Sequence, residues 1–490
     1  MEKTVRDVEC VSKVNRIKEE IVEMIRLGII GPGEKLPSIR SMAKKHGVSI
    51  TPINDAYNSL VSQGLIESRP QSGYYVTASV EKLQHELDLQ LHVGLNKSEH
   101  YSMIDDFFSG YSEIAFNVNN DIEFSFGSTS ATSSVYPEMN FNACLISCLQ
   151  SMKEGFNQQV KLHDELSLKK AVMKWMRSAR CKNSIEDISV VRSVTEGVML
   201  AVRACSERGE LVAIEAPGHV GFYFIGKYLE REVLPVPSDW NKGLDVDAFE
   251  SYLQQGMKPK CLILTANFSN PTGAVMSDEN KKRLCDLCRR YSVTIIEDDI
   301  LGELYFGPER PRPLKSFDNE NVIYVSGFGK CLTPISRLAY VSAGKKKDEF
   351  AFHKHISTSY AHPFLQMAMS EYLECGMAEK DMRFFRKWLF NCVSQYRAVI
   401  LESFPKGTKI DELRGGPYLW VRLPDGISAN ELCERSKKMG ITISPSHLFN
   451  AKDQMKNCFR FNCVALPYNS HALDAVKKLG SIACSIAVEA

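Results

Sequence analysis

The chain has 490 residues, of which 44% are hydrophobic and 24% are charged, and its formal net charge at pH 7 is +1. This length exceeds what one compact core accommodates, so two or three domains of ordinary globular composition are expected. A net charge near zero excludes a strong overall electrostatic field, and any site for nucleic acid or a membrane surface must therefore be local.

The sequence carries no targeting or membrane-spanning pattern. Its start, "MEKTVRDVEC", is charged, and a run of about eighteen apolar residues is absent. We therefore expect a cytoplasmic protein that does not contact the membrane.

The 15 cysteines do not indicate a metal site. Cys285 and Cys288 form a C-x-x-C pair, and the apolar residues around them recur at helical spacing. A zinc site would need a second cysteine pair or a histidine pair, and neither accompanies them. We expect reduced, mostly buried thiols and no bound metal.

Residues 10–78 predict three short helices followed by a hairpin. Apolar residues recur with the helical period from Val14. Ser38 and Ser49 stand where the caps of the second and third helices are expected, and Gly47 stands where the second helix ends. The stretch "LIESRPQSGYYV" then predicts two strands joined by a Pro-Gln-Ser-Gly turn. This order predicts a winged helix-turn-helix, with the second and third helices joined by the tight turn that the motif needs.

The motifs "PGEKLPSIRSMAKKHGVS" and "GLIESRPQSGYYV" resemble the GntR family of bacterial transcription regulators. The resemblance implies that the third helix lies in the major groove and that the wing touches phosphate or the minor groove. Carried over position by position, the implied DNA contacts are Ser38, Arg40, Ser49, Thr51 and Arg69.

The third helix departs from the family pattern. Ile50 stands where an arginine is frequent, Pro52 where a threonine is usual, and Asp55 where a basic residue is common. We therefore expect weaker attraction of this helix to phosphate, and its base preference cannot be copied from relatives. The alternative is a small protein-interaction module that has lost DNA binding.

Residues 79–121 are polar and of mixed sign, and they lack a sustained core pattern. This texture predicts an interdomain linker.

From residue 122 to residue 490, helical stretches alternate with short apolar runs: "LVAIE", "EVLPVP", "CLILTA", "VTIIED" and "NVIYVS". The alternation predicts an α/β domain with a mainly parallel sheet covered by helices. Ligands of such sheets bind just beyond the carboxyl ends of the strands. The polar residues that follow these runs, and that we expect at one rim, are Asn270, Asp298, Asp299, Lys330 and Arg337.

This set of side chains suits pyridoxal phosphate. A lysine amine condenses with the aldehyde of the cofactor, and an aspartate keeps the pyridine nitrogen protonated. An asparagine amide can donate to the phenolate oxygen, and an arginine can pair with the phosphate.

The motifs "NPTG", "EDD" and "GFGKCLTPISRLAY" resemble the fold-type I aminotransferases, and a GntR-like head joined to such a domain resembles the MocR group of regulators. The resemblance spans nearly the whole chain except the linker, and implies that residues 122–490 form an effector and dimerisation domain. It implies that Lys330 forms the internal aldimine and that Asp298 pairs with the pyridine nitrogen. Asn270 would meet the phenolate, and Arg337 the phosphate.

The same resemblance assigns further residues. Ser193, Val194 and Thr195 match the family's phosphate loop at a helix N-terminus. His219 takes the position of the aromatic ring that stacks on the cofactor. Arg460 matches the arginine that binds the α-carboxylate of an amino acid.

Departures from the family concentrate near the predicted cofactor. Gly327 and Gly329 stand where serines are usual, Ile300 replaces a tyrosine, and Gln159 replaces the tyrosine that a partner chain supplies. Each lost hydrogen bond to a charged group costs about 1.5–3 kcal/mol, or roughly tenfold to a hundredfold in affinity. Cofactor binding is still expected because the lysine, aspartate and arginine remain, whereas efficient transamination is less secure.

We therefore expect a DNA-binding transcription regulator whose aminotransferase-like domain binds pyridoxal phosphate. It would sense the cofactor, or an amine or amino acid, through aldimine formation, without physiological turnover; residual transaminase activity stays open. Its expected partners are double-stranded operator DNA and a second copy of the chain. Two alternatives remain: an aminotransferase of the 2-aminoadipate type, and a cofactor-free dimer scaffold for a DNA-binding head.

Overall fold

The computed structural model describes most of the chain, in two compact units, 1–103 and 104–490. Among the described residues, no helix is both long and apolar enough to span a bilayer. The predicted linker, 79–121, lies outside the described residues. The described residues are 14, 17, 18, 21, 22, 30, 33–70, 72–77, 122–129, 131, 140–151, 163–358, 360–449, 455–466 and 468–489.

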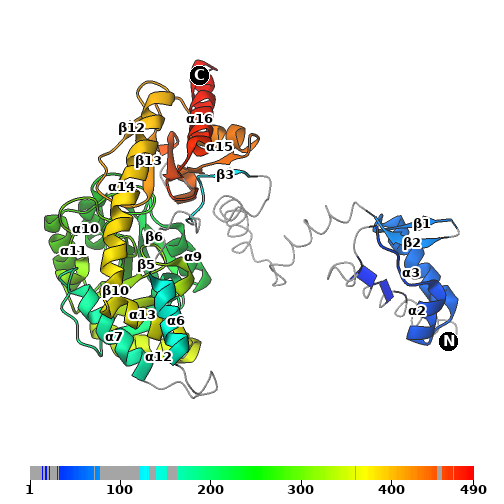
Figure 1. The fold of residues 1–490 in the computed structure, drawn as a ribbon, viewed down its shortest axis with the longest axis horizontal. Coiled ribbons are helices and arrows are strands. Elements are labelled where there is room, and N and C mark those ends of the chain that lie inside the picture. Colours follow the sequence, from blue (N-terminus) through cyan, green and yellow to red (C-terminus); the bar gives the residue numbers. More distant parts are fainter. Residues whose placement is uncertain are drawn as a thin grey trace. The chain divides into compact units, whose positions relative to one another are not determined.

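The described residues of the N-terminal unit include two complete helices and a hairpin in the predicted order (Figure 1). Residues 14, 17, 18, 21 and 22, within the predicted first helix, are helical as well. Ser38 caps the first of these helices by accepting a hydrogen bond from the Ser41 amide, and Gly47 ends it at a φ of 62°. Ser49 lies at the predicted N-cap position of the next helix, but its side chain makes no capping hydrogen bond. The elements are α2 (Ile39–His46), α3 (Ile50–Ser62), β1 (Ile66–Arg69) and β2 (Gly73–Val76).

The core of this unit explains why α3 is held firmly. Ile53, Ala56, Tyr57 and Leu60 are buried along one face of the helix, as its sequence predicts. The Tyr57 hydroxyl donates to the Pro37 carbonyl at 2.7 Å, which ties α3 to the segment before α2. Because the core holds this face, it also fixes the direction in which the opposite face of α3 points.

The C-terminal unit is built on an eight-stranded sheet with the order β4-β11-β10-β9-β8-β5-β6-β7. The five central strands, β10, β9, β8, β5 and β6, run parallel to one another. Strand β11 runs antiparallel to β10 and β4, and β7 runs antiparallel to β6. The five predicted apolar runs are β5, β6, β8, β9 and β10, so the prediction of a mainly parallel sheet is confirmed. The strands are β4 (Ile188–Val191), β5 (Leu211–Ala216), β6 (Glu232–Asp239), β7 (Gly243–Leu244), β8 (Cys261–Leu264), β9 (Thr294–Asp298), β10 (Val322–Gly327) and β11 (Ala339–Ser342).

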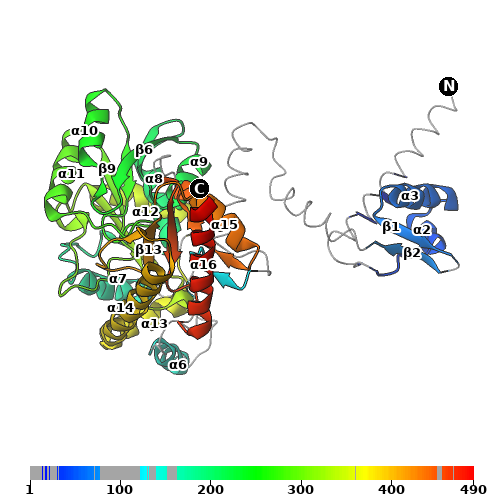
Figure 2. The same ribbon diagram turned by 90° about the horizontal axis from the view of Figure 1, so that it is seen from above.

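Helices cover both faces of this sheet, as two perpendicular views show (Figures 1 and 2). Ile263 and Ile296 pack on one face against α8, α9 and α12, and their neighbours Leu262 and Ile295 pack on the other against α10 and α11. Successive side chains of a strand point to opposite faces, so the central strands are apolar throughout. The helices are α8 (Val194–Cys205), α9 (Val220–Tyr228), α10 (Val246–Gln254), α11 (Asp278–Arg290) and α12 (Lys347–Ser357).

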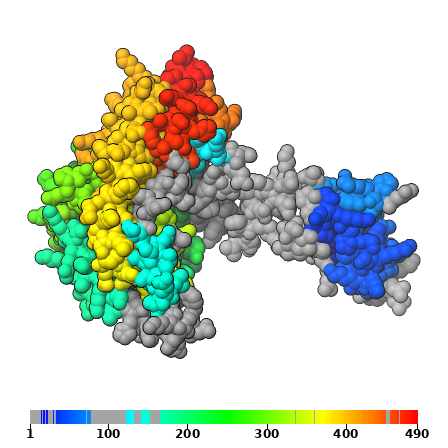
Figure 3. All heavy atoms as spheres, viewed as in Figure 1, coloured from blue at the N-terminus to red at the C-terminus, as the bar shows by residue number. Residues whose placement is uncertain are grey.

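A second, four-stranded sheet with the order β12-β13-β16-β15 forms the C-terminal part of the unit, and β14 pairs separately with β3. The long helix α14, yellow in Figure 3, and α16, red, are both exposed on the face drawn there. The remaining elements are β3 (Phe124–Ser125), α6 (Phe141–Ser151), α7 (His163–Met176), α13 (Pro363–Glu374), α14 (Met377–Ser403), β12 (Lys409–Ile410), β13 (Tyr418–Arg422), α15 (Ala429–Lys437), β14 (Ile441–Thr442), β15 (Ser444–Pro445), β16 (Cys458–Asn462), α16 (Ser470–Glu489) and the 3-10 turns η2 (Leu314–Ser316), η3 (Pro334–Ser336), η4 (Gly344–Lys346) and η5 (Ser446–Phe449).

Candidate functional site

A pocket of about 280 Å³ lies beyond the carboxyl end of β10 and brings together five of the predicted cofactor residues. A larger cavity of about 640 Å³ at the start of α11 contains none of them. The smaller pocket is lined by Ala131, Arg192, Ser193, Val194, Thr195, Ile300, Gly327, Gly329, Lys330, Pro334, Arg337, Leu338 and Ala339.

One end of this pocket is suited to a phosphate. Helix α8 begins there, and the Ser193 hydroxyl caps it by accepting from the Glu196 amide at 3.1 Å. The amides of the first turn of a helix lack partners within the helix, and the helix dipole adds positive charge at that end. Arg337 lines the same pocket. A helix start and a guanidinium together form an anion site.

Lys330 lies three residues beyond the end of β10 and is half-buried. Its Nζ donates to the Thr129 carbonyl at 2.5 Å. Thr129 follows β3, so a backbone carbonyl about two hundred residues away in sequence holds the amine at the pocket. The sequence contains no local signal for this contact.

Asp298 is the last residue of β9 and is buried. Its Oδ1 accepts the Ile300 amide at 3.0 Å. Burial raises the pKa of this carboxyl to about 7, and the positive charge of Lys330 acts in the opposite direction. A further cation beside it, such as a protonated ring nitrogen, would favour the ionised form.

His219 precedes α9, and its Nδ1 is buried without a hydrogen-bond partner among the described residues. Burial lowers the pKa of this imidazole to about 4, and the charges of Arg460 and Lys330 lower it further. The ring is therefore neutral at pH 7. A neutral flat ring within reach of both cations is compatible with the predicted stacking role.

Arg460 is fully buried on β16 and joins three parts of the unit. Its Nη1 donates to Asn270 Oδ1 at 3.0 Å, and its Nη2 donates to the Gly127 carbonyl at 2.6 Å. The guanidinium also lies over the Tyr418 ring, 4.8 Å from its centroid. Arg460, which is predicted to bind a carboxylate, and Asn270, which is predicted to meet the phenolate, are thus direct neighbours.

The sequence reasoning missed Glu215 near the end of β5. The carboxylate is buried, and its Oε1 accepts from the Thr265 amide and from the Ser269 hydroxyl, each at 3.0 Å. Burial raises its pKa to about 8, and the nearby Asp298 also raises it. Its sequence setting, inside an apolar strand, gave no indication that it shares the site with Asp298.

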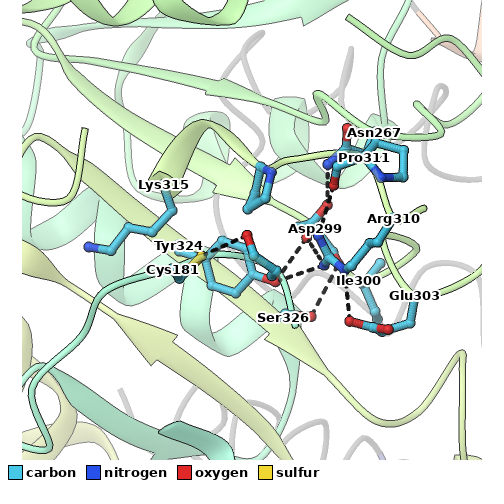
Figure 4. Close-up of polar contacts among 12 residues, drawn as sticks. Cys181, Asn267, Asp299, Ile300, Glu303, Arg310, Pro311, Lys315, Tyr324 and Ser326 are labelled. Carbon is cyan, nitrogen blue, oxygen red and sulfur yellow. Dashed lines mark hydrogen bonds and ion pairs between the residues drawn. The ribbon is translucent and has the colours of Figure 1, made fainter. Parts of the chain in front are cut away.

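Figure 4 shows a second charged cluster around Asp299, the residue that follows Asp298. Arg310 Nη2 lies 2.5 Å from Asp299 Oδ2, and its Nε donates to Glu303 at 2.8 Å. Asp299 also accepts from the Tyr324 hydroxyl at 2.8 Å and from the Asn267 amide at 3.0 Å. This cluster fixes the backbone that follows Asp298, because the two aspartates are adjacent.

The donor set thus fits pyridoxal phosphate. The helix start and Arg337 suit the phosphate, buried Asp298 suits the ring nitrogen, and Lys330 suits the aldehyde. Gln159 lies outside the described residues. Among the residues described, no cluster of histidine, cysteine or carboxylate side chains could hold a metal ion.

The two glycines that depart from the family differ in the space around them. A Cβ on Gly327 would lie 2.9 Å from the Ala339 Cβ, whereas a Cβ on Gly329 would meet no atom within 4 Å. A serine therefore fits at 329 but not at 327 without a shift of β11. The sequence alone does not separate the two positions.

We predict opposite results for the two serine variants. Gly329→Ser should tighten binding of pyridoxal phosphate about tenfold, because its hydroxyl can donate to the phosphate. Gly327→Ser should lower the free energy of unfolding by about 1–3 kcal/mol through overpacking. Absorbance titrations and urea denaturation measure the two effects; equal behaviour of both variants would contradict this geometry.

The five predicted DNA contacts, Ser38, Arg40, Ser49, Thr51 and Arg69, are all exposed in the N-terminal unit. Arg69 pairs with Glu67 at 2.7 Å and lies over the Tyr75 ring, 4.2 Å from its centroid. An exposed pair of this kind contributes little to stability, so Arg69 can exchange Glu67 for a phosphate. The DNA-contacting roles of the five residues stay predictions.

Comparison with known proteins matches two families to this chain. The class I and II aminotransferase family matches residues 132–476, and the gntR family of bacterial regulatory proteins matches residues 13–76. The predicted combination of a GntR-type winged helix-turn-helix with a fold-type I aminotransferase domain, as in the MocR architecture, is confirmed.

Similar proteins come from both groups. The "Uncharacterized HTH-type transcriptional regulator YdcR" of Escherichia coli is 29% identical over 483 residues, covering 96% of this chain and 98% of that protein. The "2-aminoadipate transaminase" of Thermus thermophilus is 28% identical over 300 residues, covering 60% of this chain and 75% of that protein.

A solved structure shares the fold of the C-terminal unit. LysN, an α-aminoadipate aminotransferase of Thermus thermophilus complexed with N-(5'-phosphopyridoxyl)-L-leucine, has a TM-score of 0.66 and 22% identity to this chain. The likeness covers 76% of this chain and 94% of LysN, and at this identity it establishes the fold alone.

Proposed function

Because the chain belongs to the class I and II aminotransferase family and carries a GntR-family helix-turn-helix domain, we propose that it is a transcription regulator whose C-terminal unit binds pyridoxal phosphate. In this proposal the cofactor, or an amine that reacts with it, changes how tightly the N-terminal unit binds operator DNA. In this proposal the protein acts in the cytoplasm, where it would meet operator DNA.

The observation that carries the cofactor proposal is the pocket itself. Lys330, Arg337 and the start of α8 line one cavity of about 280 Å³, and the buried carboxyl of Asp298 lies close enough for Lys330 to affect its pKa. LysN, which shares the fold, was solved with a phosphopyridoxyl amino acid, and this supports the same ligand class here.

Bound pyridoxal phosphate would supply an aldehyde that reacts reversibly with amines. Lys330 would hold this aldehyde covalently, Arg337 and the α8 amides would hold the phosphate, and Asp298 would keep a proton on the ring nitrogen. The Lys330 Nζ that would carry the aldehyde also has a backbone partner, the Thr129 carbonyl.

An amino-acid effector would be recognised through Arg460. Its guanidinium already holds Asn270 and the Gly127 carbonyl, so a carboxylate would compete for donors that join β16 to the loop after β8 and to the segment after β3. A ligand can change a conformation only if it binds one of two conformations more tightly than the other. A carboxylate that replaces these contacts of Arg460 would provide such a difference in affinity. A coupling of this type changes a second affinity about five- to 150-fold.

We predict that Arg460→Lys abolishes the response of DNA affinity to an amino acid but leaves the response to pyridoxal phosphate intact. Lysine keeps the charge but loses the fork that grips a carboxylate. Titrations of an operator duplex with the cofactor, an amino acid, both or neither measure this. Arg422→Lys on neighbouring β13, where Arg422 pairs with Asp411 at 2.7 Å, is the matched control. A normal amino-acid response of Arg460→Lys would contradict the assignment.

We further propose a homodimer that binds two half-sites. Ile146 and Leu149 on α6 and Phe352 and Ile356 on α12 are large apolar side chains exposed in the single chain, as an interface requires. Two-fold symmetry would pair two recognition helices with two DNA half-sites. A monomeric mass by light scattering under conditions of tight operator binding would contradict this proposal.

Enzymatic turnover is the competing function. The 2-aminoadipate transaminase of Thermus thermophilus covers 60% of this chain, which supports the same chemistry in the C-terminal unit. Sustained conversion of 2-aminoadipate and a 2-oxoacid, without any effect of either on DNA affinity, would favour this function over regulation.

A further inference from the structure

The exposed face of α3 has an unusual chemical character for a DNA-reading helix. Ile50, in its first turn, is 51% exposed, although it is a large apolar residue. Thr51, Asn54 and Asp55 are exposed beside it, and the helix contains no lysine or arginine. The first two turns of this face offer an apolar group, Ile50, and an amide, Asn54, but no cation.

Cations lie instead on α2 and β1, two elements that contact α3. Lys44 and Lys45 lie in the last turn of α2, Arg40 lies in its first turn, and Arg69 lies on the wing strand β1. All four are exposed. Phosphate neutralisation can therefore come from α2 and the wing, which leaves α3 to contact base edges.

We propose that Ile50 reads the C5-methyl group of a thymine and that Asn54 reads an adenine in each half-site. This inference rests on the proposed DNA-binding function and specifies the bases that the recognition helix selects.

The chemistry of the major groove supports this pairing. The thymine methyl is the apolar group that base pairs display in this groove, and an asparagine amide matches the N6 and N7 edge of adenine. Ile50 can offer no hydrogen bond, so guanine and cytosine edges would leave it in contact with unsatisfied polar atoms.

The spacing of the two side chains fits one short stretch of DNA. Ile50 and Asn54 are four residues apart, so they lie on the same side of the helix, about 6 Å apart along its axis. Successive bases of one strand are about 3.4 Å apart, and the two residues therefore address base pairs at neighbouring or next-neighbouring steps.

The test begins with the full chain and a library of random DNA duplexes, from which bound duplexes are enriched. Each thymine of the enriched sequence is then replaced by deoxyuridine, which lacks only the methyl group. At one thymine of each half-site, the replacement should weaken binding of the wild type about fourfold, as expected for the loss of one buried methyl group. Asn54→Ala should bind the enriched duplex about five- to 150-fold more weakly by loss of adenine contacts.

Ile50→Ala is the decisive variant, because it should bind the thymine and uracil duplexes equally. Ile50 is exposed, so the variant is expected to fold, which circular dichroism checks. Val61→Ala, which changes an exposed apolar residue at the far end of the same helix, should keep the fourfold difference.

The outcomes separate this inference from the function on which it rests. Failure of the wild type to enrich any duplex would contradict DNA binding itself. Enrichment of a sequence whose thymines can all be replaced by uracil without effect would overturn the role of Ile50. A uracil effect that persists in Ile50→Ala would overturn it equally.

Discussion

Lys330→Ala is expected to abolish covalent attachment of pyridoxal phosphate. Lys330 supplies the amine that lines the pocket beside the start of α8 and Arg337. Without it the cofactor can be held by its phosphate and ring alone, and borohydride has no protein–cofactor linkage to reduce. Peptide mass mapping after borohydride treatment should find a pyridoxyl group on the peptide containing residue 330 in the wild type and on no peptide in the variant.

Lys345→Ala is the matched control, because Lys345 is an exposed lysine on η4 outside the pocket. This variant should retain the full pyridoxyl label on Lys330. A visible absorbance band of unchanged position and height in Lys330→Ala would show that another amine carries the cofactor.

Arg310→Met is expected to cost the C-terminal unit about 3–5 kcal/mol of unfolding free energy. The Arg310 side chain is 5% exposed and that of Asp299 is 0% exposed. Methionine removes the positive charge but keeps much of the volume, so Asp299 and Glu303 remain buried without their main partner. Removing one member of such a pair is costly because the remaining charge is not solvated.

Urea denaturation followed by tryptophan fluorescence measures this effect. All four tryptophans lie between residues 175 and 420, so the signal reports on the C-terminal unit alone. Arg283→Met is the control, because Arg283 is 43% exposed and pairs with Asp247 and Glu250, each at 2.6 Å. Its cost should stay at or below about 1 kcal/mol. Equal costs for the two variants would contradict the role assigned to the buried cluster.

The strands that carry the site could be predicted because a central strand buried on both faces is a continuous apolar run. Asp298 and Lys330 could then be placed at one rim, because neighbouring parallel strands β9 and β10 end on the same side of the sheet. Strands β4 and β11 escaped prediction, since each has only four residues, three of them apolar and one a serine, and so short a run does not distinguish a strand from part of a helix.

Contacts between distant segments could not be predicted. The Thr129 carbonyl that holds Lys330 and the Gly127 carbonyl that holds Arg460 are backbone groups, and any residue type could supply them. Arg310 illustrates the same limit: the sequence placed Asp299 beyond a strand, but its partner lies in a loop whose path depends on tertiary packing.

Side-chain direction was a further limit. Ser49 has the residue type and position of a helix cap, yet its hydroxyl does not turn back to the helix. Gly327 and Gly329 look equivalent in sequence, but Gly327 pairs with Ala339 in the sheet and has no room for a side chain. Such differences arise from neighbours on other strands.

The central claim is that the cofactor pocket controls DNA binding. The most direct test measures the affinity of the cofactor-free protein for an enriched operator duplex across a series of pyridoxal phosphate concentrations, in the wild type and in Lys330→Ala. We predict that the affinity of the wild type changes about five- to 150-fold and that the affinity of the variant stays constant. A wild-type affinity that is the same at every concentration, while mass mapping shows the cofactor attached to Lys330, would contradict the claim.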